Sequence, residues 1–361
     1  MKTDVRRIFA FLQEGILQGK FDEDKPLPSL RVLMARYGAP LHTVRSAVDE
    51  LIRRGLAESR HGSGTYVTKR GMARKIGLVI PGLAYSDFFR PFADRIIQLC
   101  AKGGYKPILK DDYSRQPRKR AKEVLSFVKE LIGEKVAGVV FQPLEHFPSA
   151  GYANAKIAEA LDDAGIPLVL VDSDIVPPPK RSRYDVIGIN NFDAGFRLAA
   201  HLSEVGARRI CFLKKKGERS VSCIDRIHGI QSFLGTRRFS TDRNVLETAA
   251  DDSRAIGRYL RQRRPDAFIC GNDALAATFR QTLEKLGISV PGDLLLAGFD
   301  DVNIARLTQL TSVRQPCESI ARAAFGRLLE RLADPRLDPA EILLAAPLAV
   351  RMSTNFVQPG S

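Results

Sequence analysis

The chain has 361 residues, of which 44% are hydrophobic and 27% charged, and its formal net charge is +15. This length is too great for one ordinary domain and allows two or three domains with sizeable cores. The composition is that of a globular protein and excludes a disordered chain or a fibrous repeat. The excess of lysine and arginine favours a polyanionic partner, because these side chains neutralise phosphates and release counterions.

The positive charge is spread over the chain. Residues 1–71 contain 13 lysines and arginines against 8 aspartates and glutamates, a net of +5, which leaves +10 for the remainder. Basic runs at residues 118–122 and 214–216 are expected to be solvated faces or loops. Charge therefore supports a nucleic-acid partner without establishing one.

Neither a membrane nor an oxidising compartment is indicated. No segment approaches about 18 uninterrupted apolar residues, and the first residues lack the apolar stretch of a secretory signal. The five cysteines are widely spaced and lie mostly in apolar runs, as expected of reduced core residues. We expect a soluble, cytoplasmic protein with no metal site and no cofactor.

The first elements predicted along the chain are a helix, a tight turn and a second helix. Ser29 suits the N-cap of a short helix over residues 30–37, and Gly38 suits its left-handed end. In the second helix, residues 41–54, one face is apolar and the other is polar and basic. The apolar stripe comprises Leu41, Val44, Ala47, Val48, Leu51 and Ile52, and the outward residues include His42, Thr43 and Arg45.

Two short strands follow, at residues 56–60 and 65–69. The segment 62–64, Gly-Ser-Gly, joins them as a glycine-bearing hairpin. Helix, turn, helix and hairpin in this order predict a winged helix-turn-helix. The alternative is that a short arginine-bearing helix is only a solvated face, and three motifs at the right spacing argue against it.

In these first seventy residues the chain resembles the GntR family of winged helix-turn-helix regulators. The resemblance implies a DNA-binding domain over residues 1–70. It also implies DNA contacts from an "LPSER"-like motif, from the start of the recognition helix and from the wing tip. By position these residues are Arg31, His42, Thr43, Arg45, His61 and Gly62.

Two positions depart from the family pattern. The usual Ser-Arg before the recognition helix is Pro40-Leu41 here, and the Glu after Ser29 is Leu30. Losing that arginine removes one base or phosphate contact, so the family's usual operator core cannot be assumed for this chain.

After a basic linker at residues 71–75, buried strands alternate with helices. The apolar run at 76–80 ends at Pro81-Gly82, as is typical of a buried parallel strand. Alternating elements predict a doubly wound parallel sheet with its ligand site at the carboxyl ends of the strands. Further strands are expected at 106–109, 137–142 and 167–172, and helices near 92–100, 120–132 and 153–164.

A second alternating set is expected after the proline run at 177–179, so the fold class is α/β, a winged helix followed by two lobes. Strands are expected at 186–189, 210–213, 244–248, 267–270 and 294–298, and helices near 193–205, 225–235, 252–263, 273–286 and 318–333. The first lobe is placed at about 76–180 and 316–342, and the second at about 184–314 and 343–361. Ligands of such pairs bind in the cleft between the lobes.

Residues 76–361 also resemble the LacI/GalR family of sugar-sensing domains, which are related to periplasmic binding proteins. The matching motifs include residues 188–191 (Gly-Ile-Asn-Asn), 226–229, 265–273, 290–293, 298–301, 310–316 and 350–354. The resemblance implies a two-lobed ligand-binding and dimerisation domain. The ligand contacts that it implies are Asp172, Arg226, Asn272, Asp300 and Gln315, with Asp87, Phe88 and Phe89 supplying an aromatic stack and polar contacts from the first lobe.

These residues have structural alternatives. Asp172 could serve a strand-end turn, Asn272 could cap the next helix, and Gln315 could fasten the hinge backbone. One of Phe88 and Phe89 is expected to be core.

No catalytic residues are identified, because the chain lacks the GxSxG, Walker and HExxH patterns and its five histidines do not form ligand spacings. We expect a dimeric transcriptional repressor that binds a pseudo-palindromic operator on double-stranded DNA and responds to a small sugar, a pentose by analogy. The alternative is a cytoplasmic carbohydrate-binding protein or enzyme without a DNA role.

Overall fold

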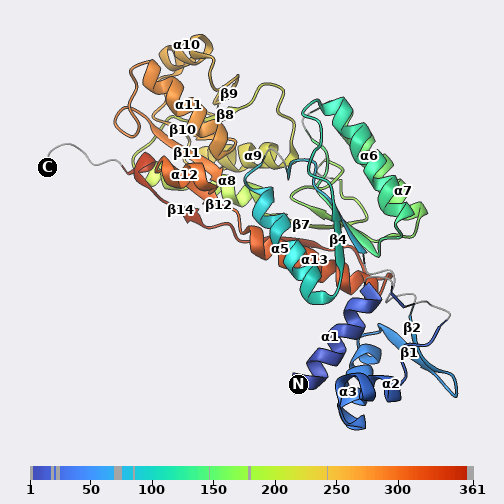
Figure 1. The fold of residues 1–361 in the computed structure, drawn as a ribbon. Helices are drawn as coiled ribbons and strands as arrows, with labels where there is room; N and C mark the ends of the chain where they lie inside the picture. Colours follow the sequence, from blue (N-terminus) through green and yellow to red (C-terminus); the bar gives the residue numbers. More distant parts are fainter. Residues whose placement is uncertain are drawn as a thin grey trace.

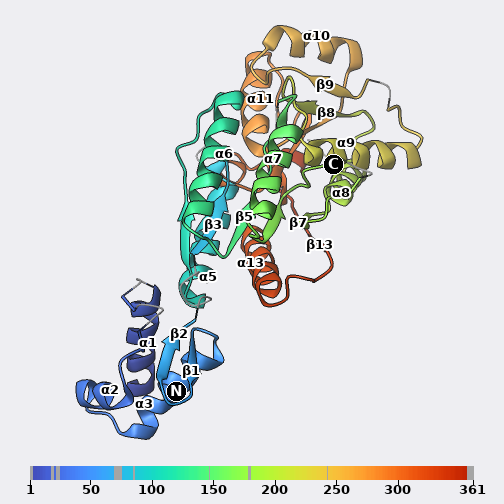
Figure 2. The ribbon, with the colours of Figure 1, turned by 90° about the vertical axis from the view of Figure 1, so that its right-hand side faces the viewer.

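The computed structural model describes residues 3–17, 20–21, 25–68, 75–83, 86–145, 147–177, 180–241 and 243–355. Figures 1 and 2 show a small N-terminal domain at one end of the molecule, followed by two larger α/β lobes. The predicted fold class, a winged helix-turn-helix joined to two parallel-sheet lobes, is confirmed.

The N-terminal domain is a three-helix winged helix. Its elements are α1 (Thr3–Leu17), α2 (Leu30–Tyr37), α3 (Leu41–Arg53), β1 (Ala57–Arg60) and β2 (Gly64–Val67). The two strands pair in antiparallel register from Ala57 opposite Val67 to Arg60 opposite Gly64. Buried side chains of all three helices form one core, among them Ile8, Leu12, Leu33, Val44 and Leu51.

The predicted ends of α2 are confirmed. Ser29 has extended backbone angles and its Oγ accepts a hydrogen bond from the Val32 N–H at 3.4 Å. Gly38 adopts φ +59°, the left-handed region in which glycine avoids the strain of a Cβ. The helix α3 starts after Pro40, whose side chain offers no cap. The turn therefore has the expected length and chemistry.

Two side chains of α3 differ from the prediction in their exposure. Leu41, assigned to the buried stripe, is 48% exposed, whereas Thr43, assigned to the outer face, is only 6% exposed. The fully buried centre of the stripe is Val44, Ala47 and Leu51. Positions 41 and 43 lie at the two edges of this centre. Their exposure therefore depends on how the neighbouring elements pack against α3, which the helical repeat of the sequence does not determine.

The first lobe is a six-stranded parallel sheet in the order β13-β7-β6-β5-β3-β4. Its strands are β3 (Lys75–Val79), β4 (Lys106–Leu109), β5 (Gly138–Phe141), β6 (Leu168–Val171), β7 (Asp185–Ile189) and β13 (Glu341–Leu344). Two pairs of helices cover its two faces: α5 (Phe89–Gly103) with α13 (Cys317–Ala333), and α6 (Pro117–Gly133) with α7 (Ala150–Asp163). Figure 2 shows the α6 and α7 pair side by side.

The second lobe has a six-stranded sheet in the order β14-β12-β11-β10-β8-β9, in which only β14 runs antiparallel to its neighbour. Its strands are β8 (Ile210–Lys214), β9 (Val245–Glu247), β10 (Ala267–Cys270), β11 (Leu295–Asp300), β12 (Thr311–Arg314) and β14 (Leu348–Ala349). The helices are α8 (Asn191–Glu204), α9 (Val221–Thr236), α10 (Ser253–Arg263), α11 (Asp273–Lys285), α12 (Asn303–Leu307) and the short 3-10 helix η2 (Met352–Thr354).

The predicted boundary between the lobes is wrong at β7 and β13. β7 pairs in parallel with β6 and with β13, so both belong to the first lobe and the chain enters the second lobe only at residues 189–191. An apolar run such as β7 fits the centre of either sheet, which is why its pattern alone does not assign it. The other crossings are at 314–317 and 344–348. Of the predicted linker, residues 71–74 lie outside the described residues, and Lys75 begins β3.

Over the ranges that the structure describes, every helix is too short or too polar to cross a lipid bilayer.

Candidate DNA interface and effector cleft

Most of the predicted DNA-contact residues project from the winged helix into solvent. Arg31 on α2, His42 and Arg45 on α3, and His61 on the wing are exposed. Neither Arg31 nor Arg45 forms an ion pair or hydrogen bond with the residues that the structure describes. Both guanidinium groups can therefore take a phosphate or a base edge without breaking an internal contact.

The arginines at the end of α3 are different. Arg53 and Arg54 both donate to the Glu50 carboxylate, with Arg54 Nε 2.6 Å from Oε1. These two hydrogen bonds lower the pKa of Glu50 below its ordinary range. Glu50 thus offsets one of the two positive charges at the C-terminal end of the recognition helix, whereas Arg45 in its first half has no such partner among the described residues.

The wing is held in shape by its own side chains. The Arg60 guanidinium lies over the Tyr66 ring at 4.4 Å, and Ser63 Oγ lies 2.6 Å from the Tyr66 hydroxyl. At the tip, Gly62 adopts φ +72° with no atom within 4 Å of the place a Cβ would take. His61 and Gly62 therefore sit on a fixed turn that a DNA backbone can approach closely.

Thr43 does not join this exposed set. Its side chain is buried, and its Oγ1 lies 3.2 Å from His42 Nε2. The expectation that Thr43 faces outward is wrong, because the side chain fills a flank of the core. Thr43 orients the exposed His42 ring.

In the sensor, Arg226 is fixed in the wall of the second lobe. It is 5% exposed, its Nε donates to Asn191 Oδ1 at 2.9 Å, and its Nη1 donates to the Gly271 carbonyl at 2.7 Å. The guanidinium lies over the Phe299 ring at 4.3 Å. Two hydrogen bonds and a cation–π contact fix the orientation of the guanidinium group, so its remaining N–H groups point in a defined direction.

Close packing of α8 on α9 brings Arg226 and Asn191 together. A Cβ on Gly195 would lie 2.2 Å from the Arg226 carbonyl oxygen, and one on Gly229 would lie 2.0 Å from the Phe192 carbonyl oxygen. Only glycine permits backbones this close. The two glycines therefore set the position of the arginine indirectly.

Asp300 and Gln315 form the neighbouring polar pair. Asp300 ends β11 with φ +106°, and its Oδ1 accepts a hydrogen bond from Gln315 Nε2 at 2.7 Å. Burial raises the pKa of Asp300 to about 6, against the lowering effects of Arg226 and of the Gln315 hydrogen bond, and Asp172 raises it further. Asp172 follows β6 in the first lobe, so residues of both lobes meet in one electrostatic cluster.

One acceptor in this cluster is unsatisfied. Gln315 is only 6% exposed, and its Oε1 has no hydrogen-bond partner among the described residues. A buried carbonyl oxygen without a donor costs free energy. A ligand that brings a hydroxyl or amine hydrogen to this atom would remove that cost.

A pocket of about 210 Å³ lies between the lobes and shares Asp172 with the cluster, whereas Arg226, Asp300 and Gln315 are not among its lining residues. Its polar lining includes Asp172 and Ser173 from the first lobe and Asn191, Ser222 and Asp225 from the second. Burial raises the pKa of Asp225, with Glu341 adding to the effect and His228 opposing it. The lining carries four carboxylates and two hydroxyls as well as Lys180 and Arg181, so it offers both acceptors and donors of hydrogen bonds to a polar ligand.

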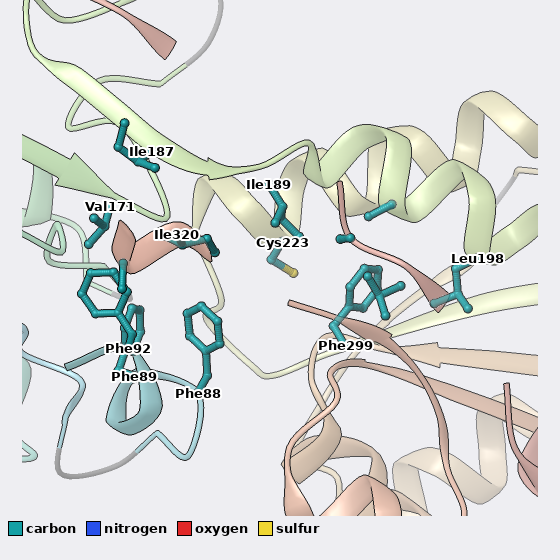
Figure 3. Close-up of a cluster of buried hydrophobic side chains, with 14 of the residues drawn as sticks. Phe88, Phe89, Phe92, Val171, Ile187, Ile189, Leu198, Cys223, Phe299 and Ile320 are labelled. Atoms are coloured by element: carbon teal, nitrogen blue, oxygen red, sulfur yellow. The ribbon is translucent and has the colours of Figure 1, made fainter. Parts of the chain in front are cut away.

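The remaining predicted ligand residues are placed differently. Asn272 is exposed and caps α11, its Oδ1 accepting from the Leu275 N–H at 2.9 Å, so it fulfils the capping alternative. Asp87 is exposed next to α5. Phe88 and Phe89 are both buried, with ring centroids 4.7 Å apart. Figure 3 shows Phe88 at the side of the first-lobe cluster that faces Cys223 and Phe299 of the second lobe.

Two residues of this region were not predicted as functional. Asn191 belongs to the motif at residues 188–191, yet its hold on Arg226 depends on the distant helix α9. Asp273 is fully buried beneath the cluster, where its carboxylate accepts from Ser312 Oγ at 2.7 Å and from the Val302 N–H at 3.0 Å. Burial, with Asp300 nearby, raises the pKa of Asp273 to about 8. Its sequence signal is its place at the end of the motif at residues 265–273.

Among the side chains that the structure describes, no group of three His, Cys, Asp or Glu residues is placed to hold a metal ion.

Comparison with known proteins identifies both parts. The model of the bacterial regulatory proteins of the gntR family matches residues 5–67, and that of the periplasmic binding protein-like domain matches residues 199–354. The arabinose metabolism transcriptional repressor of Geobacillus stearothermophilus is 26% identical over 358 residues, 95% of each chain. An uncharacterized HTH-type transcriptional regulator of Streptomyces limosus is 30% identical over 300 residues, 81% of this chain and 82% of its own. The chain belongs to the HTH-type transcriptional regulators.

The regulator thus joins a gntR-type head to a periplasmic-binding-protein-like sensor, and both resemblances inferred from its motifs are confirmed. A LacI family transcriptional regulator of Enterococcus faecium, solved with bound ribose, has the same fold over 77% of this chain and 98% of its own, at a TM-score of 0.62 and 21% identity. The regulator acts on transcription through DNA binding and is not an enzyme.

Proposed function

We propose that the regulator is a cytoplasmic repressor that binds a pseudo-palindromic operator as a homodimer and leaves it when a small sugar closes the cleft between the lobes. The observation that carries this proposal is the pairing of two unlike sites in one chain. One is an outward face with unpaired Arg31 and Arg45. The other is a buried interlobe cluster with an unsatisfied Gln315 oxygen.

The head supports major-groove binding. The first half of α3 carries exposed His42 and Arg45, while the wing presents His61 and Gly62 on a fixed turn. A recognition helix in the major groove with a wing on the adjacent backbone uses these two surfaces together. Two such heads in a dimer would read the two halves of an operator with two-fold symmetry.

The cleft supports a neutral polyhydroxylated ligand. The carboxylates of Asp172 and Asp300 and the Gln315 Oε1 atom can accept hydrogen bonds from a ligand, and Arg226 can donate from a fixed direction. Adjacent sugar hydroxyls both donate and accept, so a single sugar ring can satisfy both kinds of group. A pentose is our first choice, since one similar protein is a repressor of arabinose metabolism and another was solved with ribose.

Coupling between the sites follows from the position of the cluster. Residues of both lobes meet there, so a ligand that contacts both favours the closed arrangement and alters the spacing of the two heads in a dimer. A coupling free energy of about 1–3 kcal/mol would change operator affinity about 5- to 150-fold.

The proposal is tested with the full-length protein and DNA selected from a random duplex library. We expect salt-sensitive, sequence-specific binding that weakens when one of a panel of pentoses, hexoses, uronic acids and purines is added. The same compound should raise the Tm by mass action, and sedimentation should give a dimer. If sugar binds but no DNA is selected, the chain is a carbohydrate-binding protein and the regulatory mechanism fails.

A further inference from the structure

The first residue of the recognition helix is a leucine that the core does not use. Leu41 is 48% exposed, and with Val32 it is one of two exposed large apolar side chains described in the winged helix. The buried stripe of α3 is completed without it by Val44, Ala47 and Leu51. A solvent-facing leucine at this point contributes little to folding. We therefore look for its role in the contact between the recognition helix and DNA.

Leu41 stands beside the free arginine of the same helix. Residues four apart on an α-helix lie one above the other, which places Leu41 next to Arg45 on the outer face. Arg45 is exposed and without a partner in the described structure. Leu41 is therefore part of the surface that α3 offers to DNA, at the end of the helix that enters the groove first.

The chemistry at this end is apolar. Pro40 carries no N–H and its side chain makes no cap, and Leu41 has no side-chain donor or acceptor. Hydrogen-bonded readout of a base is impossible for these two side chains. In the major groove the distinctive apolar group on a base edge is the C5-methyl of thymine.

We propose that Leu41 recognises a thymine methyl group in each half of the operator, an inference that rests on the proposed DNA-binding function. Contact between the leucine and the methyl removes both apolar surfaces from water, and this gain is lost with any base that lacks the methyl. Leu41 is thus a specificity-determining residue, where the GntR pattern carries an arginine.

The test removes one methyl group at a time. In the selected operator each thymine is replaced by deoxyuridine, which differs only by the absence of the C5-methyl, and Kd is measured with full-length wild-type protein and Leu41→Ala. We expect one thymine in each half-site whose replacement weakens wild-type binding about fourfold, the value of one buried methyl-sized group. The same replacement should leave Leu41→Ala binding unchanged.

A matched control is Val32→Ala, which removes the other exposed apolar side chain of the head. This variant should keep the wild-type sensitivity to deoxyuridine at the same thymine. Leu41→Arg should shift the preferred base at that position from thymine to guanine, because arginine bonds the guanine edge through two hydrogen bonds. Both positions are exposed, so thermal unfolding curves should match the wild type.

The inference is overturned if Leu41→Ala responds to every deoxyuridine as the wild type does, or if no thymine is sensitive in an operator that the protein binds specifically. Absence of any sequence-specific binding by the wild-type protein is a different result, which overturns the proposed function and this inference together.

Discussion

In the winged helix most residues proposed to contact DNA project into solvent, whereas in the sensor Arg226 and Gln315 are buried and hydrogen-bonded to neighbouring groups. Arg45 has no partner in the described structure, but Arg226 is held by Asn191, by the Gly271 carbonyl and by the Phe299 ring. The same residue type is thus kept free in one site and fixed in the other. Substitutions in the head should change binding alone, while those in the cleft should change binding and stability together.

The largest expected effect tests the cleft side of this comparison through pH. The fully buried Asp273 carboxyl has a pKa raised by burial to about 8, so the folded state holds its proton more tightly than the unfolded state. Its contribution to stability is complete below about pH 4 and is lost as the pH rises through about 8. Between pH 5 and pH 8 the unfolding free energy of the wild type should therefore fall. In Asp273→Asn, whose amide imitates the protonated acid, that fall should be smaller by about 3 kcal/mol.

Urea unfolding at a series of pH values measures this slope. Asp193→Asn, which alters an exposed carboxylate at the start of α8, is the control and should keep the wild-type slope. Equal slopes for wild type and Asp273→Asn would contradict the burial argument.

An effect of similar size is expected for Arg226→Ala. Removing the guanidinium leaves Asn191 Oδ1 and the Gly271 carbonyl without their donor and Asp300 without a nearby positive charge. The unfolding free energy should fall by about 3 kcal/mol, and sugar-induced stabilisation should disappear. Arg226→Lys retains the charge and should lose less. If Arg226→Ala unfolds like the wild type, the arginine is not the structural centre of the cleft.

In the head, Arg45→Ala should weaken specific DNA binding by about 1–3 kcal/mol without moving the Tm. Arg53→Ala lies on the same helix but removes a side chain already paired with Glu50, so its effect on affinity should be smaller. Fluorescence anisotropy with the selected operator compares the two variants. If Arg45→Ala also lowers the Tm, the exposed arginine of the head supports the fold as the buried arginine of the cleft does, and the contrast between the two sites is wrong.

The smallest effect is expected at the N-cap of α2. The Ser29 side chain is exposed and its hydrogen bond to the Val32 N–H is long, at 3.4 Å, so Ser29→Ala should cost only about 0.5 kcal/mol. Hydrogen exchange at the Val32 amide is the most direct measurement, and exchange should quicken there before it changes in α1. Unchanged exchange would show that the cap contributes nothing.

The local features of the head were accessible from the sequence because caps, turns and helical period act over a few residues. Ser29 and Gly38 define α2 in the structure as they do in the pattern. The exposure of Leu41 and Thr43 was not accessible, because each flanks the apolar stripe and its burial depends on neighbouring elements. The helix α1 was overlooked although its buried residues, Val5, Ile8, Phe9, Leu12 and Ile16, recur at helical spacing.

The sensor shows where non-local pairing limits prediction. Strand β7 was recognised as a strand but given to the wrong sheet, since only its pairing with β6 and β13 distinguishes the two lobes. The short elements β12, β14 and α12 lack a clear period and were not predicted. In the cleft, motif positions led to Arg226 and Asp300, whereas the role of Asn191 depends on a contact across 35 residues.

Because β7 belongs to the first lobe, the connector between the lobes lies directly before the residues that hold Arg226. The chain leaves that lobe at Ile189, and Asn191, the first residue of α8, already holds Arg226. The connector and the wall of the cleft are therefore two residues apart along the chain. Residues 189–191 both join the lobes and line the pocket, so a substitution in this connector should alter ligand binding and lobe movement together.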